Sequence, residues 1–153
     1  MATERTVALI VLRLAAAGTA VAMGAIHLHL WYDGYRYLDT IGPLFLLNAI
    51  GAGLLAMSLL ITPTRLLSVL ATLGTLFTAG TLVALIVSLT SGLFGFQETL
   101  DANLVEPTLA VEAAGCVLLV ALALLSRHGG ARAGRAPGTG PRTARRSDDG
   151  GRL

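Results

Sequence analysis

The chain has 153 residues, of which 54% are hydrophobic and only 13% charged, and its mean hydropathy is +0.74. A soluble domain carries about 25% charged residues and needs no long apolar runs, so the composition excludes an ordinary soluble protein. The single cysteine, Cys116, cannot close an intrachain disulfide or form a CxxC pair, which disfavours thiol redox chemistry.

The first apolar run covers residues 7–31 and is interrupted only by Arg13. Because Arg13 lies near the start, its side chain can reach the headgroups, and about nineteen residues remain to cross the hydrocarbon. A cleaved signal peptide is the alternative, since the small residues at 15–17 and 20–22 resemble cleavage sites. The run continues past both sites into an aromatic cluster, which favours a membrane-anchored helix.

That aromatic cluster consists of Trp31, Tyr32, Tyr35 and Tyr37. Aromatic residues at the end of a span are typical of the membrane interface, so we expect them to anchor the helix there. The second run, 42–62, has Pro43 in its first turn. A turn at 62–65 leads into the third run, 66–89, and so short a link predicts that these two helices are antiparallel neighbours.

The connection at 90–106 follows, and its segment 92–96 is apolar enough to lie in the interface. We therefore expect a short interfacial helix or a re-entrant dip here. Pro107 opens the fourth run, 107–126, and beyond residue 128 only Gly-, Ala-, Pro-, Arg- and Ser-rich sequence remains. The chain is thus predicted to be an all-α polytopic membrane protein, with an antiparallel bundle of four transmembrane helices over 1–128 and a disordered Arg-rich cytoplasmic tail over 129–153.

The placement of arginine predicts the orientation. Ten of the eleven arginines lie before the first run or near its start, in the second connection or after the fourth run, and only Arg36 lies on the other side. By the positive-inside rule, both termini are cytoplasmic and the two longer connections face outward from the cell membrane. The arginines of the tail could also hold it against anionic lipid.

Small residues at four-residue spacing predict close packing of the helices. The first run has two such stripes on opposite sides, one through Gly18, Ala22, Ala25 and His29 and the other through Ala16, Ala20, Met23 and His27. Two close-packing faces predict neighbours on both sides of this helix, and one stripe could make a homo-oligomer contact. The series Thr72, Thr75, Thr78 and Thr81 is interpreted as interhelical hydrogen bonding rather than an ion path.

Polar side chains inside the spans lie at nearly the same depth, and they are His27, His29, Asn48 and Glu112. At 1.5 Å per residue they fall roughly 3–9 Å below the outer interface, on three different helices. Ionisable groups in a membrane are costly and usually face the bundle interior or a water-filled cavity. The sequence therefore predicts one shared ligand site that opens outward, over which Glu98 and Asp101 of the third connection could close.

Each of these residues also has a structural alternative. A histidine this near an aromatic belt is more often bonded to headgroups or to a backbone carbonyl, and Asn48 could simply link two helices. Glu112 lies about one and a half turns inside its span, so it must be protonated or paired with a cation such as a protonated histidine.

No catalytic motif, cofactor or metal site is predicted. A haem with two axial histidines needs them on facing helices, whereas His27 and His29 point about 160° apart on one helix. A His/Glu metal site has no supporting ligand spacing. A pocket for a quinone or another small lipophile needs only apolar walls and one or two hydrogen-bonding groups. Small four-helix multidrug exporters use a buried glutamate, but in their first helix and with a weak charge bias, unlike this chain.

The segments HLHLW (27–31), GYR (34–36) and IGPLFLLN (41–48) resemble a group of uncharacterised four-helix membrane proteins from actinobacteria. The resemblance covers the first two helices and their connection, and it implies no activity. The favoured function is a non-enzymatic accessory subunit or a module that binds or transports a small molecule, and the alternative is a membrane-embedded redox or metal-dependent enzyme subunit. The expected partners are the lipid bilayer and another copy or a larger membrane complex, with no nucleic acid.

Overall fold

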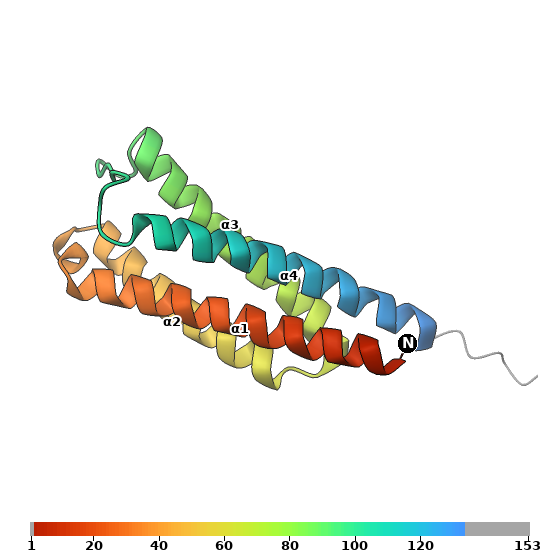
Figure 1. Ribbon diagram of the computed structural model, residues 1–153. Coiled ribbons are helices and arrows are strands. Elements are labelled where there is room, and N and C mark those ends of the chain that lie inside the picture. The colour runs from red at the N-terminus through yellow and green to blue at the C-terminus, as the bar shows by residue number, and fades with distance from the viewer. Residues whose placement is uncertain (1, 134–153) are drawn as a thin grey trace, which may run out of the picture.

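The computed structural model describes residues 2–133, and Figure 1 shows that they are almost entirely helical. The helices are α1 (Ala2–Tyr32), α2 (Ile41–Ile61), α3 (Thr64–Thr90) and α4 (Val105–Ala133), with the short 3-10 helix η1 (Tyr35–Tyr37) after α1. Each of the four long helices is long and apolar enough to cross a membrane, which confirms the predicted all-α class. Because α4 continues to Ala133, the predicted tail is helical over 129–133, and the rest of that prediction lies outside the described residues.

Proline and glycine set several of the boundaries. Pro43 and Pro107 are the third residues of α2 and α4, where the first turn has no use for their missing N–H groups. Pro63, with an extended ψ of 149°, separates α2 from α3. Gly92, with φ of +79°, follows the last turn of α3 in the left-handed conformation that commonly ends a helix.

The connection between α3 and α4 contains a tight turn instead of the expected interfacial helix, while the alternative of a re-entrant dip stays a prediction. Leu93 and Phe96 exchange two backbone hydrogen bonds of 2.6 and 2.9 Å, while Phe94 and Gly95 between them have φ of 53° and 80°. Two central residues with positive φ define a turn that reverses the chain without entering a helix. The apolar composition of this segment was therefore a misleading signal for a helix.

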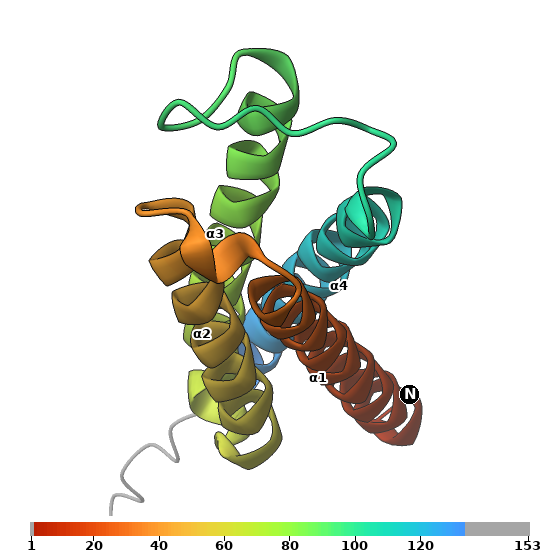
Figure 2. The ribbon, with the colours of Figure 1, turned by 90° about the vertical axis from the view of Figure 1, so that its left-hand side faces the viewer.

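The helices form two antiparallel hairpins, α1–α2 and α3–α4, which pack together mainly through α1 and α4. Seen along the bundle in Figure 2, α2 and α3 diverge from their link and have few contacts with each other. The prediction that the short link makes them neighbours is thus wrong beyond the link. Gly24 explains the preference of α2 for α1, because a Cβ there would meet Ala49 O and Ala52 Cβ at 3.2 Å.

The apolar core fills the half of the bundle near the α2–α3 link, which we call the link end. Its fully buried members come from all four helices and include Ala16, Ala20, Leu55, Leu59, Leu67, Ala71, Leu119 and Leu122. The opposite half, which carries η1 and the α3–α4 connection, is called the loop end. The dense packing at the link end leaves the loop end as the place where the helices separate.

Arg13 also caps α2 at the link end. Its half-buried guanidinium donates hydrogen bonds to the backbone carbonyls of Leu59 and Thr62 at the last turn of α2. Cations are favourable at this end of a helix because its carbonyls have no partners within the helix.

Only one of the two small-residue stripes of α1 is buried within the chain. Ala16 and Ala20 are 0% and 4% exposed, whereas Gly18 is exposed and a Cβ added there would meet nothing within 4 Å. Among residues 2–133, the stripe through Gly18 therefore has no close-packed neighbour, and the homo-oligomer contact stays a prediction.

The interpretation of the threonine series as interhelical hydrogen bonding is confirmed only in part. Thr72 accepts from Arg127 of α4 at 3.2 Å and the Thr81 hydroxyl contacts Met23 Sδ of α1 at 3.8 Å, but local acceptors are also used. The hydroxyls of Thr72, Thr75 and Thr81 each donate to a carbonyl one turn earlier in α3 itself, at 2.8 Å. A threonine in a membrane helix can always reach this local acceptor, which competes with any partner on another helix.

Candidate functional site

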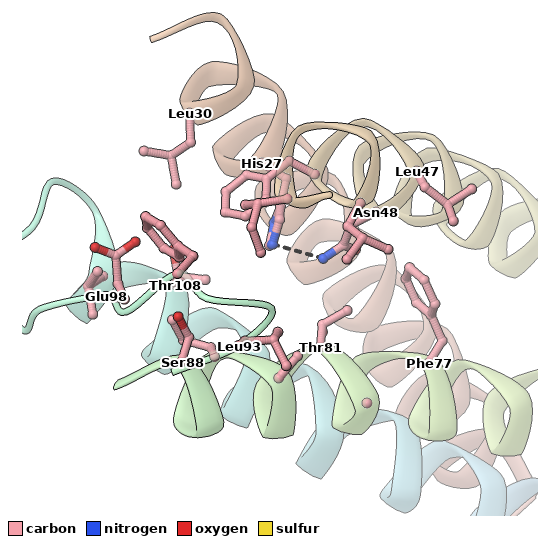
Figure 3. Close-up of a pocket in the computed structure, with 18 of the residues that line it drawn as sticks. His27, Leu30, Leu47, Asn48, Phe77, Thr81, Ser88, Leu93, Glu98 and Thr108 are labelled. Carbon is pink, nitrogen blue, oxygen red and sulfur yellow. Dashed lines mark hydrogen bonds between the residues drawn. The ribbon is translucent and has the colours of Figure 1, made fainter. Parts of the chain in front are cut away.

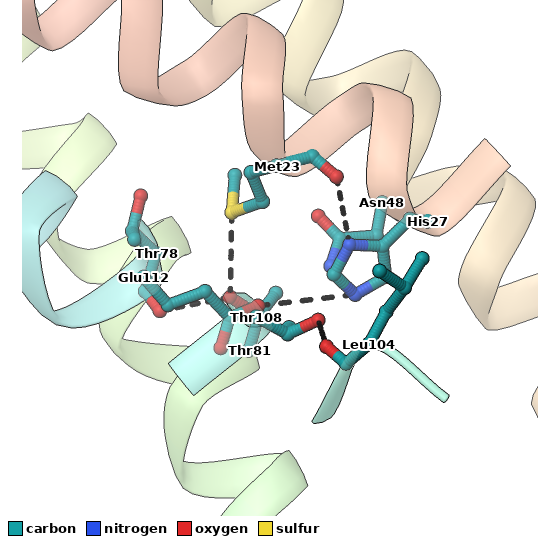
Figure 4. Close-up of polar contacts among 8 residues, drawn as sticks. All are labelled: Met23, His27, Asn48, Thr78, Thr81, Leu104, Thr108 and Glu112. Atoms are coloured by element: carbon teal, nitrogen blue, oxygen red, sulfur yellow. Dashed lines mark hydrogen bonds and ion pairs between the residues drawn. The ribbon is translucent and has the colours of Figure 1, made fainter. Parts of the chain in front are cut away.

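His27 lies on the buried face of α1, toward the loop end, and is 7% exposed. Its Nδ1 is 2.9 Å from the Met23 carbonyl oxygen, which can only accept, so Nδ1 carries the proton. Its Nε2 is 2.8 Å from Nδ2 of Asn48 on α2, and the neutral ring accepts a hydrogen bond there. Both ring nitrogens are thus used within the protein, as Figure 4 shows.

Glu112 approaches the same imidazole from α4 and is 1% exposed. Its Oε1 is 3.8 Å from His27 Nε2, which is too long for a hydrogen bond. The Thr81 hydroxyl of α3 lies near this carboxyl group in Figure 4 but donates to the Thr78 carbonyl at 2.8 Å. Within residues 2–133, neither carboxyl oxygen of Glu112 has a hydrogen-bond partner of normal geometry.

The chemistry of this arrangement follows from the cost of burial. An isolated carboxylate out of water is strongly unfavourable, so Glu112 is either a neutral acid or the partner of a charged His27. The observed contacts fit a neutral ring, because the proton on Nδ1 and the lone pair on Nε2 are both engaged. A small shift of Glu112 and a turn of the Asn48 amide would convert the contact into an ion pair.

A cavity of about 380 Å³ lies beside this cluster at the loop end, and Figure 3 shows the side chains around it. Most of its walls are apolar. Its polar lining residues come from all four helices and the α3–α4 connection, and they are His27, Asn48, Thr81, Ser88, Glu98 and Thr108. Glu112 does not line the cavity but lies behind His27 and Thr108, one turn further along α4.

Glu98 stands at the loop end of the cavity and is 9% exposed. Its Oε2 accepts a hydrogen bond of 2.5 Å from the Tyr35 hydroxyl, and its backbone N–H donates to the Ser88 carbonyl at 3.1 Å. The Tyr35 ring stacks on Phe45 with centroids 4.6 Å apart and meets the edge of Phe96 at 5.7 Å. These contacts join η1, α2, α3 and the α3–α4 connection over the cavity.

Burial and the adjacent Glu98 carboxylate raise the pKa of the Tyr35 hydroxyl well above its usual value. The phenol therefore stays protonated and keeps donating to Glu98 throughout the ordinary pH range.

The structure brings together three of the predicted site residues, His27, Asn48 and Glu112, and places Glu98 at the far end of the adjoining cavity. His29 is separate, because it is exposed on the other face of α1. Asp101 is also exposed, and it does not line the cavity.

Sequence reasoning missed four groups that shape the cavity, and they are Tyr35, Thr81, Ser88 and Thr108. Ser88 and Thr81 lie seven positions apart on α3 and share one face, so a search for polar residues at two-turn spacing would have found them. Tyr35 was assigned to an interfacial belt, and only its contact with Glu98 shows that it covers the cavity.

The described residues bring no third His, Cys, Asp or Glu to the His27–Glu112 pair in a grouping that could hold a metal ion. Comparisons of the chain with family models, with curated proteins and with solved structures each gave no match.

Proposed function

We propose that the chain is an integral protein of the cell membrane that binds a small lipophilic molecule in the loop-end cavity, either to hold it for a larger complex or to pass it across the bilayer. The observation that carries this proposal is the cavity itself, with apolar walls and a hydrogen-bonded His27–Asn48 pair in its lining. Ligand pockets for small molecules have this character, with volumes of about 300–1,000 Å³ and a few fixed polar groups.

The route into the cavity is sideways, from the lipid. Most residues that line the cavity belong to α2 and α3, which diverge at the loop end. The lining residues Leu44, Leu47 and Leu76 are 41%, 63% and 66% exposed, so the opening between the two helices is itself apolar. A molecule dissolved in the bilayer can enter by this route without crossing water.

The arginine distribution supports an orientation in which the loop end is the outer end. Arg5 donates to the Leu125 carbonyl at 2.9 Å, Arg127 donates to the Thr72 hydroxyl at 3.2 Å, and Arg13 caps α2, so three arginines join the helices at the link end. Among the described residues of the loop end, Arg36 is the only arginine. The positive-inside rule then puts the cavity in the outer half of the membrane.

The test is to extract the protein with its surrounding lipid, using a styrene–maleic acid copolymer, and to identify the bound hydrophobic molecules by mass spectrometry. Gly80 lines the cavity, and a Cβ there would meet nothing within 4 Å, so Gly80→Leu adds a side chain to the cavity without a backbone clash. Gly53→Leu is the matched control, because Gly53 of α2 has equally open surroundings and does not line the cavity.

We expect the wild type and Gly53→Leu to carry the same lipophile near one copy per chain. Gly80→Leu should carry about tenfold less, since overpacking a site typically costs about 1–3 kcal/mol. Equal amounts of the same lipophile per chain in all three proteins would refute the proposal.

A further inference from the structure

We propose that the molecule bound in this cavity is a lipophilic amine, held as its ammonium form against the Glu98 carboxylate. This inference rests on the proposed function and specifies the ligand. It is drawn from the hydrogen-bonding groups that the cavity offers, from its charge and from its aromatic side chains.

Four of the six side-chain N–H and O–H donors of the lining are used within the protein. The hydroxyls of Thr81 and Thr108 donate to carbonyls of their own segments at 2.8 and 2.6 Å. The Nδ1–H of His27 and one Nδ2–H of Asn48 are also engaged, in contacts of 2.9 and 2.8 Å. A ligand that can only accept, such as a quinone, would find the Ser88 hydroxyl and the second Asn48 N–H as its partners.

Acceptors are left over in the same lining. Asn48 Oδ1 and Ser88 Oγ are buried and without a hydrogen-bond partner among the described residues. A buried polar group that is left unpaired destabilises the protein, so a partner supplied by a ligand is favourable. The Glu98 carboxylate makes one contact through each oxygen, to Tyr35 and to the Thr99 N–H, although a carboxylate has about four acceptor positions. A ligand that donates hydrogen bonds would meet this surplus.

Charge favours a cationic donor over a neutral one. Among residues 2–133, no lysine or arginine lines the cavity, and its histidine, His27, has the contacts of a neutral ring. Glu98 is the only acidic side chain that the described residues contribute to the lining, and no cationic side chain lies beside it there. An alkylammonium ion, which stays protonated up to about pH 10, would supply the missing charge and up to three N–H donors.

The aromatic side chains point to the same class of ligand. Phe45, Phe77 and Phe96 line the cavity, and Tyr35 stacks on Phe45 over the Glu98 contact. Ring faces attract cations and also accommodate an alkyl chain. Apolar walls, aromatic rings and one carboxylate together fit a hydrophobic body that ends in an amine.

The inference can be tested with three probes that share one decyl chain carrying a diazirine and differ only in their head group, which is an amine, an alcohol or a carboxylate. Each probe is photoactivated with the full chain in lipid nanodiscs, and adducts are mapped by mass spectrometry. The readout is the ratio of adducts on cavity residues such as Ala84 to adducts on the lipid-facing residue Val83 of the same helix, which corrects for partitioning into the bilayer.

The amine should give a cavity ratio about tenfold higher than the alcohol, and the carboxylate should give the lowest ratio. Glu98→Gln should remove most of the preference for the amine, because its amide oxygen can still accept from Tyr35 while the charge is gone. Glu106→Gln is the matched control, since Glu106 is also an acid of the loop end but is exposed and does not line the cavity.

Equal cavity ratios for the amine and the alcohol, or an amine preference that survives Glu98→Gln, would overturn the inference while leaving the proposed function in place. If no probe labels cavity residues more strongly than it labels Val83, both the inference and the proposed function are refuted.

Discussion

At the scale of single residues, the main feature is a set of acceptors that outnumber the donors around one imidazole. His27 uses both of its nitrogens on Met23 and Asn48, so it has nothing to offer Glu112 at 3.8 Å. Two carboxyl oxygens are therefore buried without a partner among residues 2–133. Such a group lowers the stability of the fold.

Replacing Glu112 by leucine should therefore stabilise the protein. Glu112→Leu removes two unpaired oxygens and keeps an apolar side chain of similar size, which should raise the free energy of unfolding by about 1–3 kcal/mol. Glu112→Gln is the control, because its amide is equally buried and polar and should give little or no gain. Thermal or denaturant unfolding in detergent micelles would measure both.

A decrease in the free energy of unfolding on Glu112→Leu would change the interpretation of the His27–Glu112 pair. If Glu112→Leu destabilises the protein by about 3–5 kcal/mol, the carboxylate forms an ion pair with a charged His27, because breaking a buried pair leaves one charge unsatisfied.

The sequence predicted much of this cluster. Counting residues from the helix ends placed His27, Asn48 and Glu112 at one depth, and the structure brings them together. The same count placed His29 there as well, although it is exposed on the other face of α1. Depth follows from the rise per residue, but the face that a helix turns inward depends on its neighbours, which one sequence does not give.

At the scale of elements, the connection over the cavity is held by one short side-chain contact. Glu98 binds Tyr35 of η1 through its side chain and Ser88 of α3 through its backbone. The expected interfacial helix is absent because Phe94 and Gly95 adopt positive φ, and a turn of this kind depends on single backbone angles that an apolar composition does not reveal.

Removing the Tyr35 hydroxyl should loosen this connection. Tyr35→Phe leaves a buried carboxylate oxygen without its donor, which should cost about 1.5–3 kcal/mol and increase hydrogen exchange over residues 91–104. Tyr37→Phe is the matched control, because the Tyr37 ring is 75% exposed and its hydroxyl contacts only the neighbouring Arg36. Equal exchange in both variants would show that the Tyr35–Glu98 contact does not hold the connection.

The same hydroxyl predicts a pH dependence. Since the pKa of Tyr35 is raised in the folded state, its contribution to stability is complete below about pH 10, the value in the unfolded chain, and declines as the pH rises further. The most alkaline step of a spectrophotometric tyrosine titration should therefore be missing in Tyr35→Phe. If the step remains, Tyr35 is not the residue that titrates there.

At the scale of the whole molecule, packing is unequal along the bundle. Leu59, Leu67 and Leu122 are at most 1% exposed in the core at the link end, whereas the loop end holds the cavity and the diverging ends of α2 and α3. The number of long apolar helices followed from hydropathy, because a bilayer fixes the length of an apolar run, but α1 and α4 extend beyond the apolar runs themselves. The separation of α2 from α3 could not be predicted, since a short link fixes where two helices meet but not the angle between them.

The central claim, a cavity that opens in the outer half of the membrane, depends on which end of the bundle faces outward. Labelling single cysteines in a Cys116→Ala background with an impermeant thiol reagent in intact cells tests this directly. Asp33→Cys and Asn103→Cys lie at exposed positions of the loop end, and Thr64→Cys lies at the exposed α2–α3 link. The arginine distribution predicts that the first two react and that Thr64→Cys reacts only after the cells are opened. Labelling of Thr64→Cys in intact cells, with Asp33→Cys and Asn103→Cys protected, would put the cavity on the cytoplasmic side and contradict the account.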